Sequence, residues 1–278
     1  MQATDRQDTQ LINKTATQAD AKIWLSRSAA SWYVATAIGQ GLFVVFIALF
    51  YYPSTLSGNF AAWDRKPNIE GFAPGVTSGN LMFAVHVLLA ALMTTIGLIQ
   101  LVPTIRQRWP QVHHISGRVL LTLSLLLAAG GLWLVWVRGT YLTLTGAWGI
   151  TNNALLIFIF AAMAWRTAVQ RRIADHRRWA LRLFIAASGV WFMRLGYIIW
   201  GMGTGGLGIG DSMNGPFDYF LAFGNVLVPL AILELYLHHQ AKGSAPARKA
   251  MAVALGMLAV LTLGGGIGAW VAMWSPYI

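Results

Sequence analysis

Residues 119–137 read VLLTLSLLLAAGGLWLVWV, nineteen consecutive residues of which none is charged. A helix needs about 20 mostly apolar residues to cross the hydrocarbon of a bilayer. Six further segments meet this criterion, and we expect each of them to cross a membrane as a helix. These segments are 30–50, 80–102, 149–165, 179–200, 218–237 and 251–274.

The composition of the whole chain supports the same interpretation. Of its 278 residues, 56% are hydrophobic and 10% are charged, whereas soluble domains carry about 25% charged residues. So much apolar surface excludes a disordered chain, and the absence of cysteine excludes cysteine-based zinc sites, iron–sulfur clusters and disulfide-stapled domains. We predict an all-α integral membrane protein with about seven transmembrane helices. Six or eight helices also fit, because residues 142–144 or 203–210 could be re-entrant.

The distribution of Lys and Arg predicts how these helices are oriented. If residues 1–29 form a cytoplasmic segment, the loops and helix ends on that side hold sixteen of the twenty basic residues. Lys and Arg favour cytoplasmic ends, so we expect a cytoplasmic N-terminus and an outside C-terminus in the inner membrane of a bacterium. The net charge of +11 then reflects a lipid bilayer as partner, and we expect no nucleic acid because the basic residues are divided among short loops. Residues 30–278 form a single transmembrane domain in this prediction.

Two connections between the spans repeat a pattern of histidine followed by arginine. His113 precedes Arg118 at the start of the third span, and His176 precedes Arg182 at the start of the fifth. Each pair places an imidazole at the cytoplasmic entrance of a helix and a guanidinium about 8–9 Å deeper. We expect the second to fifth spans to form a central four-helix bundle.

The depth of the polar residues predicts one polar site toward the outer side. His86 lies six residues from the start of the second span and Arg194 six residues from the end of the fifth, so each is roughly 9 Å deep. Asn225 has a similar depth in the sixth span, and Asn152 and Asn153 are slightly shallower in the fourth. Polar groups inside a span are costly and usually face protein, water or a ligand. We therefore expect these side chains to line one pocket.

A second polar site is expected toward the inner side. Glu234 is the only acid well inside a span, and Arg118 or Arg182 is its expected partner. His113 and His176 have similar depths on two helices, so together they could ligate a metal or haem iron. The full set of inner-side residues is Gln100, His113, Arg118, His176, Arg182 and Glu234.

Purely structural roles compete with binding at these positions. His86 could hydrogen-bond a neighbouring carbonyl group, Arg194 could extend toward the outer headgroups, and Glu234 could form only an ion pair. Residues 203–208 match G-x-G-x-x-G, a motif that binds dinucleotides only between a strand and a helix. Between two membrane spans we interpret it as a flexible loop or lid.

The two histidine motifs resemble the signatures of a known family. His113-x-x-x-Gly-Arg118, preceded by Gln100, and His176-Arg-Arg-Trp-x-x-Arg182 are similar to motifs of bacterial predicted membrane proteins, catalogued as domain-of-unknown-function family 2306. The resemblance covers about half of the chain, from residue 86 to residue 234, and implies a helical membrane fold. At His114 this family more often has arginine. A looser likeness to transmembrane b-type cytochromes implies that histidines on facing helices hold haem.

Three functions fit these features. The first is a redox protein that binds haem b through His113 and His176, or a quinone headgroup between His86 and the outer Arg and Asn donors. The second is an accessory or assembly subunit of a larger membrane complex, without a cofactor or chemistry of its own. The third is a small proton-coupled transporter lined by His86, Glu234 and the arginines, although the sequence shows no broken helix at mid-membrane. A zinc hydrolase is more distant, because the adjacent His113 and His114 would not face the same way on a helix.

Overall fold

The computed structural model describes residues 2–66 and 71–278, and within the first helix it describes side chains from residue 15 onward. These residues form helices and no strands. The α-helices are α1 (Gln2–Leu56), α2 (Thr77–Leu101), α3 (Pro103–Arg108), α4 (Pro110–Trp136), α5 (Leu144–Val169), α6 (Ile173–Ala187), α7 (Gly189–Thr204), α8 (Pro216–Lys242) and α9 (Ala245–Ala269). Three short helices are η1 (Phe60–Arg65), η2 (Trp270–Trp274) and η3 (Ser275–Tyr277).

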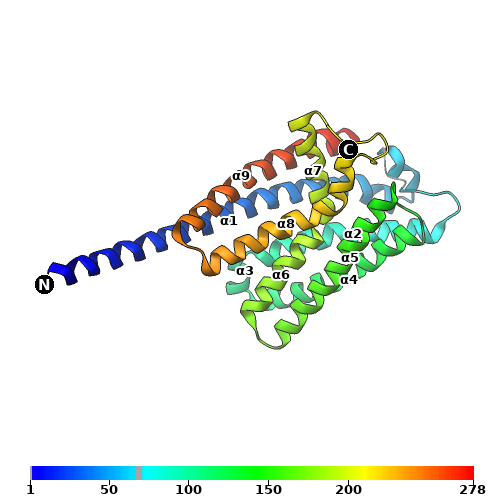
Figure 1. The fold of residues 1–278 in the computed structure, drawn as a ribbon. Helices are drawn as coiled ribbons and strands as arrows, with labels where there is room; N and C mark the ends of the chain where they lie inside the picture. Colours follow the sequence, from blue (N-terminus) through cyan, green and yellow to red (C-terminus); the bar gives the residue numbers. More distant parts are fainter. Residues whose placement is uncertain (1, 67–70) are drawn as a thin grey trace.

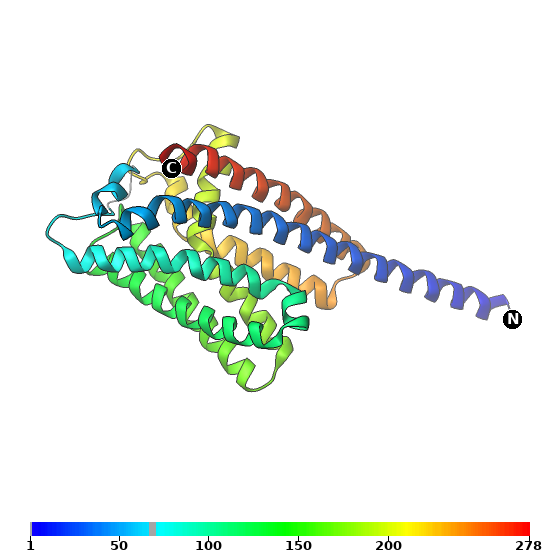
Figure 2. The same cartoon turned by 180° about the vertical axis from the view of Figure 1, so that it is seen from behind.

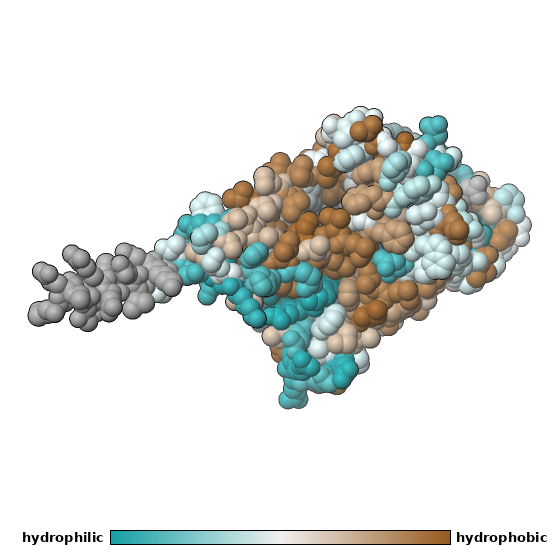
Figure 3. Space-filling view, in the orientation of Figure 1, coloured by the Kyte–Doolittle hydropathy of each residue, from teal (hydrophilic) through white to brown (hydrophobic). Residues whose placement is uncertain are grey.

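The long helices confirm the predicted membrane fold. Six segments of the described chain are long and apolar enough to cross a bilayer: α1 from Thr15, α2, α4, α5, α8, and Ala245–Tyr277. α6 and α7 meet the same criterion together, although they are bent by 57° where they join. The described part of the chain therefore has six candidate spans, or seven when the bent pair counts as one. Figure 3 shows hydrophobic side chains over the middle of the bundle and more hydrophilic ones toward its ends.

Two helices differ from the predicted spans. α1 does not begin near residue 30 but runs without a break from Gln2, so its first part extends away from the bundle (Figure 1). The expected fifth span is broken at Ser188, between the end of α6 and the start of α7. Ser188 donates a hydrogen bond from Oγ to the carbonyl of Phe184 at 2.8 Å, and Gly189 follows it. Such Ser–Gly pairs are a known cause of helix kinks, so the expectation of no broken helix was wrong.

The helices pack in two groups. α2, α4, α5 and α6 form the expected four-helix bundle, in which Gly97 of α2 faces the ring of Phe184 on α6. α1 and α9 lie along each other (Figures 1 and 2), and a Cβ placed on Gly266 would be 3.0 Å from the Cα of Gly39. Small residues at such a crossing allow close backbone approach in a membrane. α7 packs on α8 and α9, and α8 also contacts α5 and α6, so these two helices join the groups.

The two ends of the bundle have different coverings. α3, the α5–α6 connection and the α8–α9 connection lie at one end, from which α1 extends (Figure 1). We call this the basic end, because it carries Arg106, Arg172, Arg177, Lys242 and Arg248. At the opposite end, which we call the capped end, lie η1 and residues 270–278. Which side of the membrane each end faces follows only from the charge pattern, and it stays a prediction.

Candidate functional site

At the basic end, the side chain of Gln100 fastens α2 to the first turn of α4. Its Nε2 donates to the carbonyl of His113 at 3.1 Å and to the hydroxyl of Ser116 at 2.5 Å. The Nδ1 atom of His113 is buried and has no hydrogen-bond partner. Gln100 therefore orders the backbone that carries His113 and leaves its imidazole available for another interaction.

His176 is held in one orientation by the helix that precedes it. Its Nδ1 lies 2.9 Å from the carbonyl oxygen of Ala164 on α5. A carbonyl oxygen only accepts, so Nδ1 carries a proton, and in the neutral imidazole the lone pair is on Nε2. A backbone carbonyl is a common hydrogen-bond partner of the other ring nitrogen of a metal-ligating histidine.

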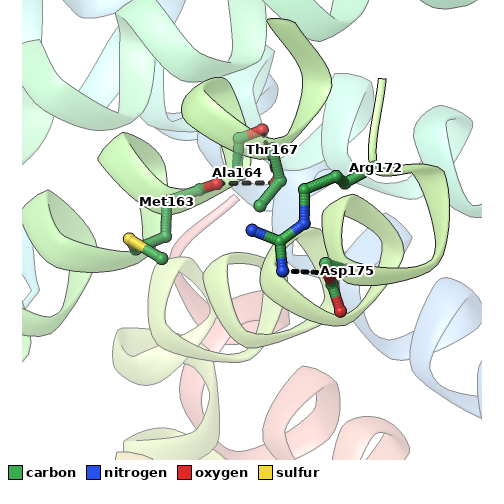
Figure 4. A network of polar contacts seen from close by, with 5 residues as sticks. All are labelled: Met163, Ala164, Thr167, Arg172 and Asp175. Atoms are coloured by element: carbon green, nitrogen blue, oxygen red, sulfur yellow. Dashed lines mark hydrogen bonds and ion pairs between the residues drawn. The ribbon is translucent and has the colours of Figure 1, made fainter. Parts of the chain in front are cut away.

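The end of α5 around Ala164 and the start of α6 carry further polar contacts. Thr167 donates from Oγ1 to the carbonyls of Met163 and Ala164, at 2.7 and 3.2 Å (Figure 4). Arg172 forms an ion pair with Asp175 on the next turn. The carbonyl that orients His176 thus belongs to a fixed part of the chain.

The two imidazoles at the basic end lie in each other's neighbourhood. The charges of Arg106, His114 and His176 are all close enough to His113 to act on it electrostatically. The rings of His113 and His114 have centroids 6.1 Å apart, but His114 is exposed. The structure therefore places His113 and His176 at the same end of the bundle, and His114 is exposed.

The remaining residues of the predicted inner site divide into two groups. Arg182 donates from Nε and Nη2 to the two carboxylate oxygens of Glu234, at 2.7 and 2.8 Å. Of the two expected partners of Glu234, the structure selects Arg182, whose guanidinium also lies 4.5 Å from the ring centroid of Trp179. Arg118 is exposed on α4 and makes no ion pair with any carboxylate of the described residues.

His86 lies in the contact between α2 and α4. A Cβ placed on Gly130 would be 3.4 Å from Nδ1 of His86, and one placed on Gly131 would be 3.5 Å from its Cε1. The imidazole thus fills the space that two glycines leave. Its Nδ1 is buried and has no hydrogen-bond partner, so the expected bond to a neighbouring carbonyl is not made through that atom.

Arg194 has different neighbours from His86. Its Nη1 donates to the carbonyl of Val190 at 3.0 Å, and its guanidinium carbon lies 5.0 Å from the ring centroid of Phe43 on α1. The structure places Arg194 against α1 at the capped end, and the expected contact with His86 is not among its interactions.

Two of the three asparagines of the predicted outer site, Asn153 and Asn225, lie next to each other at the break between α6 and α7. A Cβ placed on Gly189 would be 2.7 Å from Nδ2 of Asn153 and 3.3 Å from Oδ1 of Asn225. Asn225 also donates to the carbonyls of Leu221 and Ala222 of its own helix, at 2.9 and 3.0 Å. The Oδ1 atom of Asn153 is buried without a partner. The break therefore carries a small polar cluster inside the bundle.

Sequence reasoning missed the polar contact on the other side of this break. Gln40 of α1 is 1% exposed and donates from Nε2 to the hydroxyl of Ser188 at 2.9 Å. Both residues line a small cavity of about 10 Å³, which has room for about one water molecule. A glutamine inside an otherwise apolar run was the available signal.

A second cavity lies at the capped end, beside the start of α2. It has a volume of about 280 Å³, and its lining includes Ser78, Trp133, Arg138 and Thr140. None of the residues predicted as site residues from the sequence lines either cavity. Within residues 2–66 and 71–278, no three His, Asp or Glu side chains are grouped as a metal site, which leaves the zinc-hydrolase alternative without a ligand set there.

These features define a multi-pass helical membrane protein with polar clusters at both ends and at one helix break. Residues 83–214 match the profile of the family described as "Predicted membrane protein (DUF2306)". This segment of the chain, which runs from α2 through α7 and contains both histidine motifs, belongs to that family, as the motifs predicted. No curated protein and no solved structure matches the chain.

Proposed function

We propose that this protein is a membrane redox protein that binds a haem of the b type at its basic end, with His113 and His176 as the iron ligands. The observation that carries the proposal is the bond between Nδ1 of His176 and the carbonyl of Ala164. It fixes the tautomer in which Nε2 is free to ligate, and a backbone carbonyl is a common outer partner of such a ligand.

The donor set of the basic end fits this group. Both imidazoles come from first turns of helices, α4 and α6, and each is partly exposed, so a planar ligand can reach them from the end of the bundle. Arg118 is about one and a half helical turns deeper on α4 and has no carboxylate partner among the described residues, which suits an anionic propionate. When bound, the iron would supply one-electron chemistry; the chain would hold, orient and partly shield it.

The outer residues do not support the same kind of site. A quinone headgroup between His86 and Arg194 needs both side chains to face one space. His86 fills the α2–α4 contact, and Arg194 lies against the aromatic side chains of α1. We therefore place the redox site at the basic end alone, and by the distribution of basic residues we assign that end to the cytoplasm.

The test is an absorption spectrum of the protein purified after expression with added haem precursor. We expect a Soret band and reduced-state bands after dithionite, both lost in H113A and in H176A. H238A is the matched control, because His238 is an exposed histidine near the C-terminal end of α8, which also lies at the basic end of the bundle. A purified, folded wild-type protein without a Soret band and without extractable haem would overturn the proposal.

Transport is a second candidate, favoured by the broken helix. Discontinuous helices with polar groups at the break are typical of binding sites in secondary transporters. Here the break carries Asn153, Asn225 and Gln40. Proton flux into proteoliposomes, followed with an enclosed pH-sensitive dye, tests this candidate. It predicts a flux that is lost in N153A and E234Q, whereas the redox proposal predicts none in the wild type.

A further inference from the structure

The ion pair between α6 and α8 lies on the outer surface of the bundle, although it is inside two spans. Arg182 donates to both carboxylate oxygens of Glu234, at 2.7 and 2.8 Å, yet the Glu234 side chain is 49% exposed. Glu234 lies eight residues before the end of α8, which places it about 12 Å from that end. Ionisable side chains inside spans almost always face the interior of a bundle or a water-filled cavity. The exposure of this carboxylate therefore indicates that another molecule covers it.

The exposed residues beside Glu234 on α8 are apolar. Leu227 and Leu235 are 46% and 55% exposed, and Ala231, one turn before Glu234 and Leu235, is exposed as well. In Figure 3, hydrophilic side chains extend from the basic end into the region of α6 and α8, beside hydrophobic ones. A single copy would expose both the leucines and the carboxylate to lipid, which is a good solvent only for the leucines.

A second arginine of α6 lies close to this ion pair in the helix. Arg178 precedes Arg182 by four residues, so both side chains lie on the same side of α6. Arg178 is exposed and forms no ion pair or hydrogen bond with any of the described residues. Arg182 uses only one lone pair of each carboxylate oxygen of Glu234. The surface formed by Arg178, Glu234 and the exposed apolar residues, which we call the α6–α8 face, therefore carries both a free cation and an anion that can accept further bonds.

We propose that the α6–α8 face is the interface of a symmetric dimer, in which Arg178 of each copy pairs with Glu234 of the other. A two-fold axis along the membrane normal places the same residues of both copies at the same depth, and contacts across it are reciprocal. A second copy therefore brings a cation to each carboxylate at the required level. Arg178 is one turn, about 6 Å, nearer the basic end than Arg182, a distance that a long arginine side chain spans. An anionic lipid headgroup fits this face less well, because Glu234 repels it.

The first measurement counts subunits in liposomes of phosphatidylcholine, with one fluorophore on each chain and a series of protein-to-lipid ratios. We expect the wild type to change from one photobleaching step to two as its density rises. R178Q should weaken dimerisation about tenfold or more, and R178E, which places two carboxylates together, should prevent it. R171Q is the matched control and should dimerise like the wild type, because Arg171 is also exposed but precedes α6. Arg178 has no polar contact to lose within one copy, so R178Q should unfold at the temperature of the wild type.

The second measurement shows which face is buried, and it uses the absence of cysteine from the chain. Ala241 is exposed and lies two helical turns beyond Glu234 on the same side of α8. A241C should be linked to its counterpart by a bifunctional maleimide, and less so when combined with R178Q. Q111C is the control, because Gln111 is exposed at the basic end but belongs to α4.

Four results would overturn the proposal. The wild type could stay monomeric at every density, R178Q could dimerise as well as R171Q, or A241C could link no more than Q111C. In the fourth, a monomeric wild type retains phosphatidylglycerol through purification and R178Q loses it, which identifies a lipid as the molecule that covers this face. The haem proposal is tested separately, because R178Q keeps His113 and His176 and should retain any Soret band of the wild type.

Discussion

The ion pair between Arg182 and Glu234 should contribute measurably to the packing of α6 on α8. Both nitrogen–oxygen contacts are short, 2.7 and 2.8 Å, and the guanidinium also lies over the ring of Trp179. We expect R182Q to destabilise the protein more than E234Q does. Loss of the arginine leaves a carboxylate inside a span without a partner, whereas loss of the carboxylate leaves the guanidinium stacked on Trp179.

The exposure of the pair sets the size of this effect. Removing one partner from a fully buried pair costs about 3–5 kcal/mol, and an exposed pair contributes about 0.2–1 kcal/mol. The side chains of Arg182 and Glu234 are 19% and 49% exposed, so this pair lies between the two cases. We expect R182Q to lower the free energy of unfolding by about 2 kcal/mol and E234Q by about 1 kcal/mol, with a coupling of about 1 kcal/mol.

The measurement is a double-mutant cycle on unfolding in mixed micelles of a mild detergent and dodecyl sulfate. R177Q is the control, because Arg177 also joins α6 to α8 but donates only to the amide oxygen of Gln240, at 3.0 Å on the surface. Its effect should stay within about 0.5 kcal/mol. If the effects of R182Q and E234Q simply add in the double mutant, the pair has no energy of its own and this reasoning fails.

Three further predictions test other parts of the fold. Gly149→Ala should destabilise the protein by about 1–3 kcal/mol, because the new Cβ would lie 2.3 Å from the carbonyl oxygen of Ala222. The control in the same unfolding assay is Gly264→Ala, which should be neutral or slightly stabilising because its new Cβ meets nothing within 4 Å. Asp218→Asn should loosen the α7–α8 connection, measured as faster proteolysis there, because the buried carboxylate accepts from two loop N–H groups and a tyrosine hydroxyl, each at 2.8 Å. Burial lowers the pKa of Lys66, which means that protonation costs more in the folded state than in the unfolded state, so stability rises as pH climbs from the lowered pKa toward 10.5. K66M should therefore be more stable than the wild type near neutral pH, and unfolding temperatures recorded against pH should converge toward 10.5; a constant gap would contradict this.

The sequence predicts the spans well because one physical constraint governs them. The thickness of the hydrocarbon fixes the length of each apolar run, and the runs can be read without knowing how the helices pack. The same reasoning places Glu234 and Arg182 at one depth, and the structure pairs them. The structure of the α7–α8 connection was harder to predict from the sequence. Its glycine motif, residues 203–208, suggested a flexible loop or lid, and this stays a prediction. Beyond the motif, Gly210 and Gly215 both donate their backbone N–H groups to the carboxylate of Asp218, which no pattern in the sequence indicated.

Depth along a helix says nothing about direction around it, and this limits the prediction of the outer site. A rise of about 1.5 Å per residue places His86 and Arg194 at the same level. The rotation of each helix depends on packing, which turns His86 toward the glycines of α4 and Arg194 toward Phe43 of α1.

The bend at Ser188 explains why the predicted outer site is divided. α6 packs on α5 and α8, inside the four-helix bundle, whereas α7 packs on α8 and α9. After the turn of 57°, Arg194 of α7 lies over the ring of Phe43 on α1. Gly189 at the bend leaves the space that the amides of Asn153 and Asn225 occupy, so the same break creates the polar cluster inside the bundle.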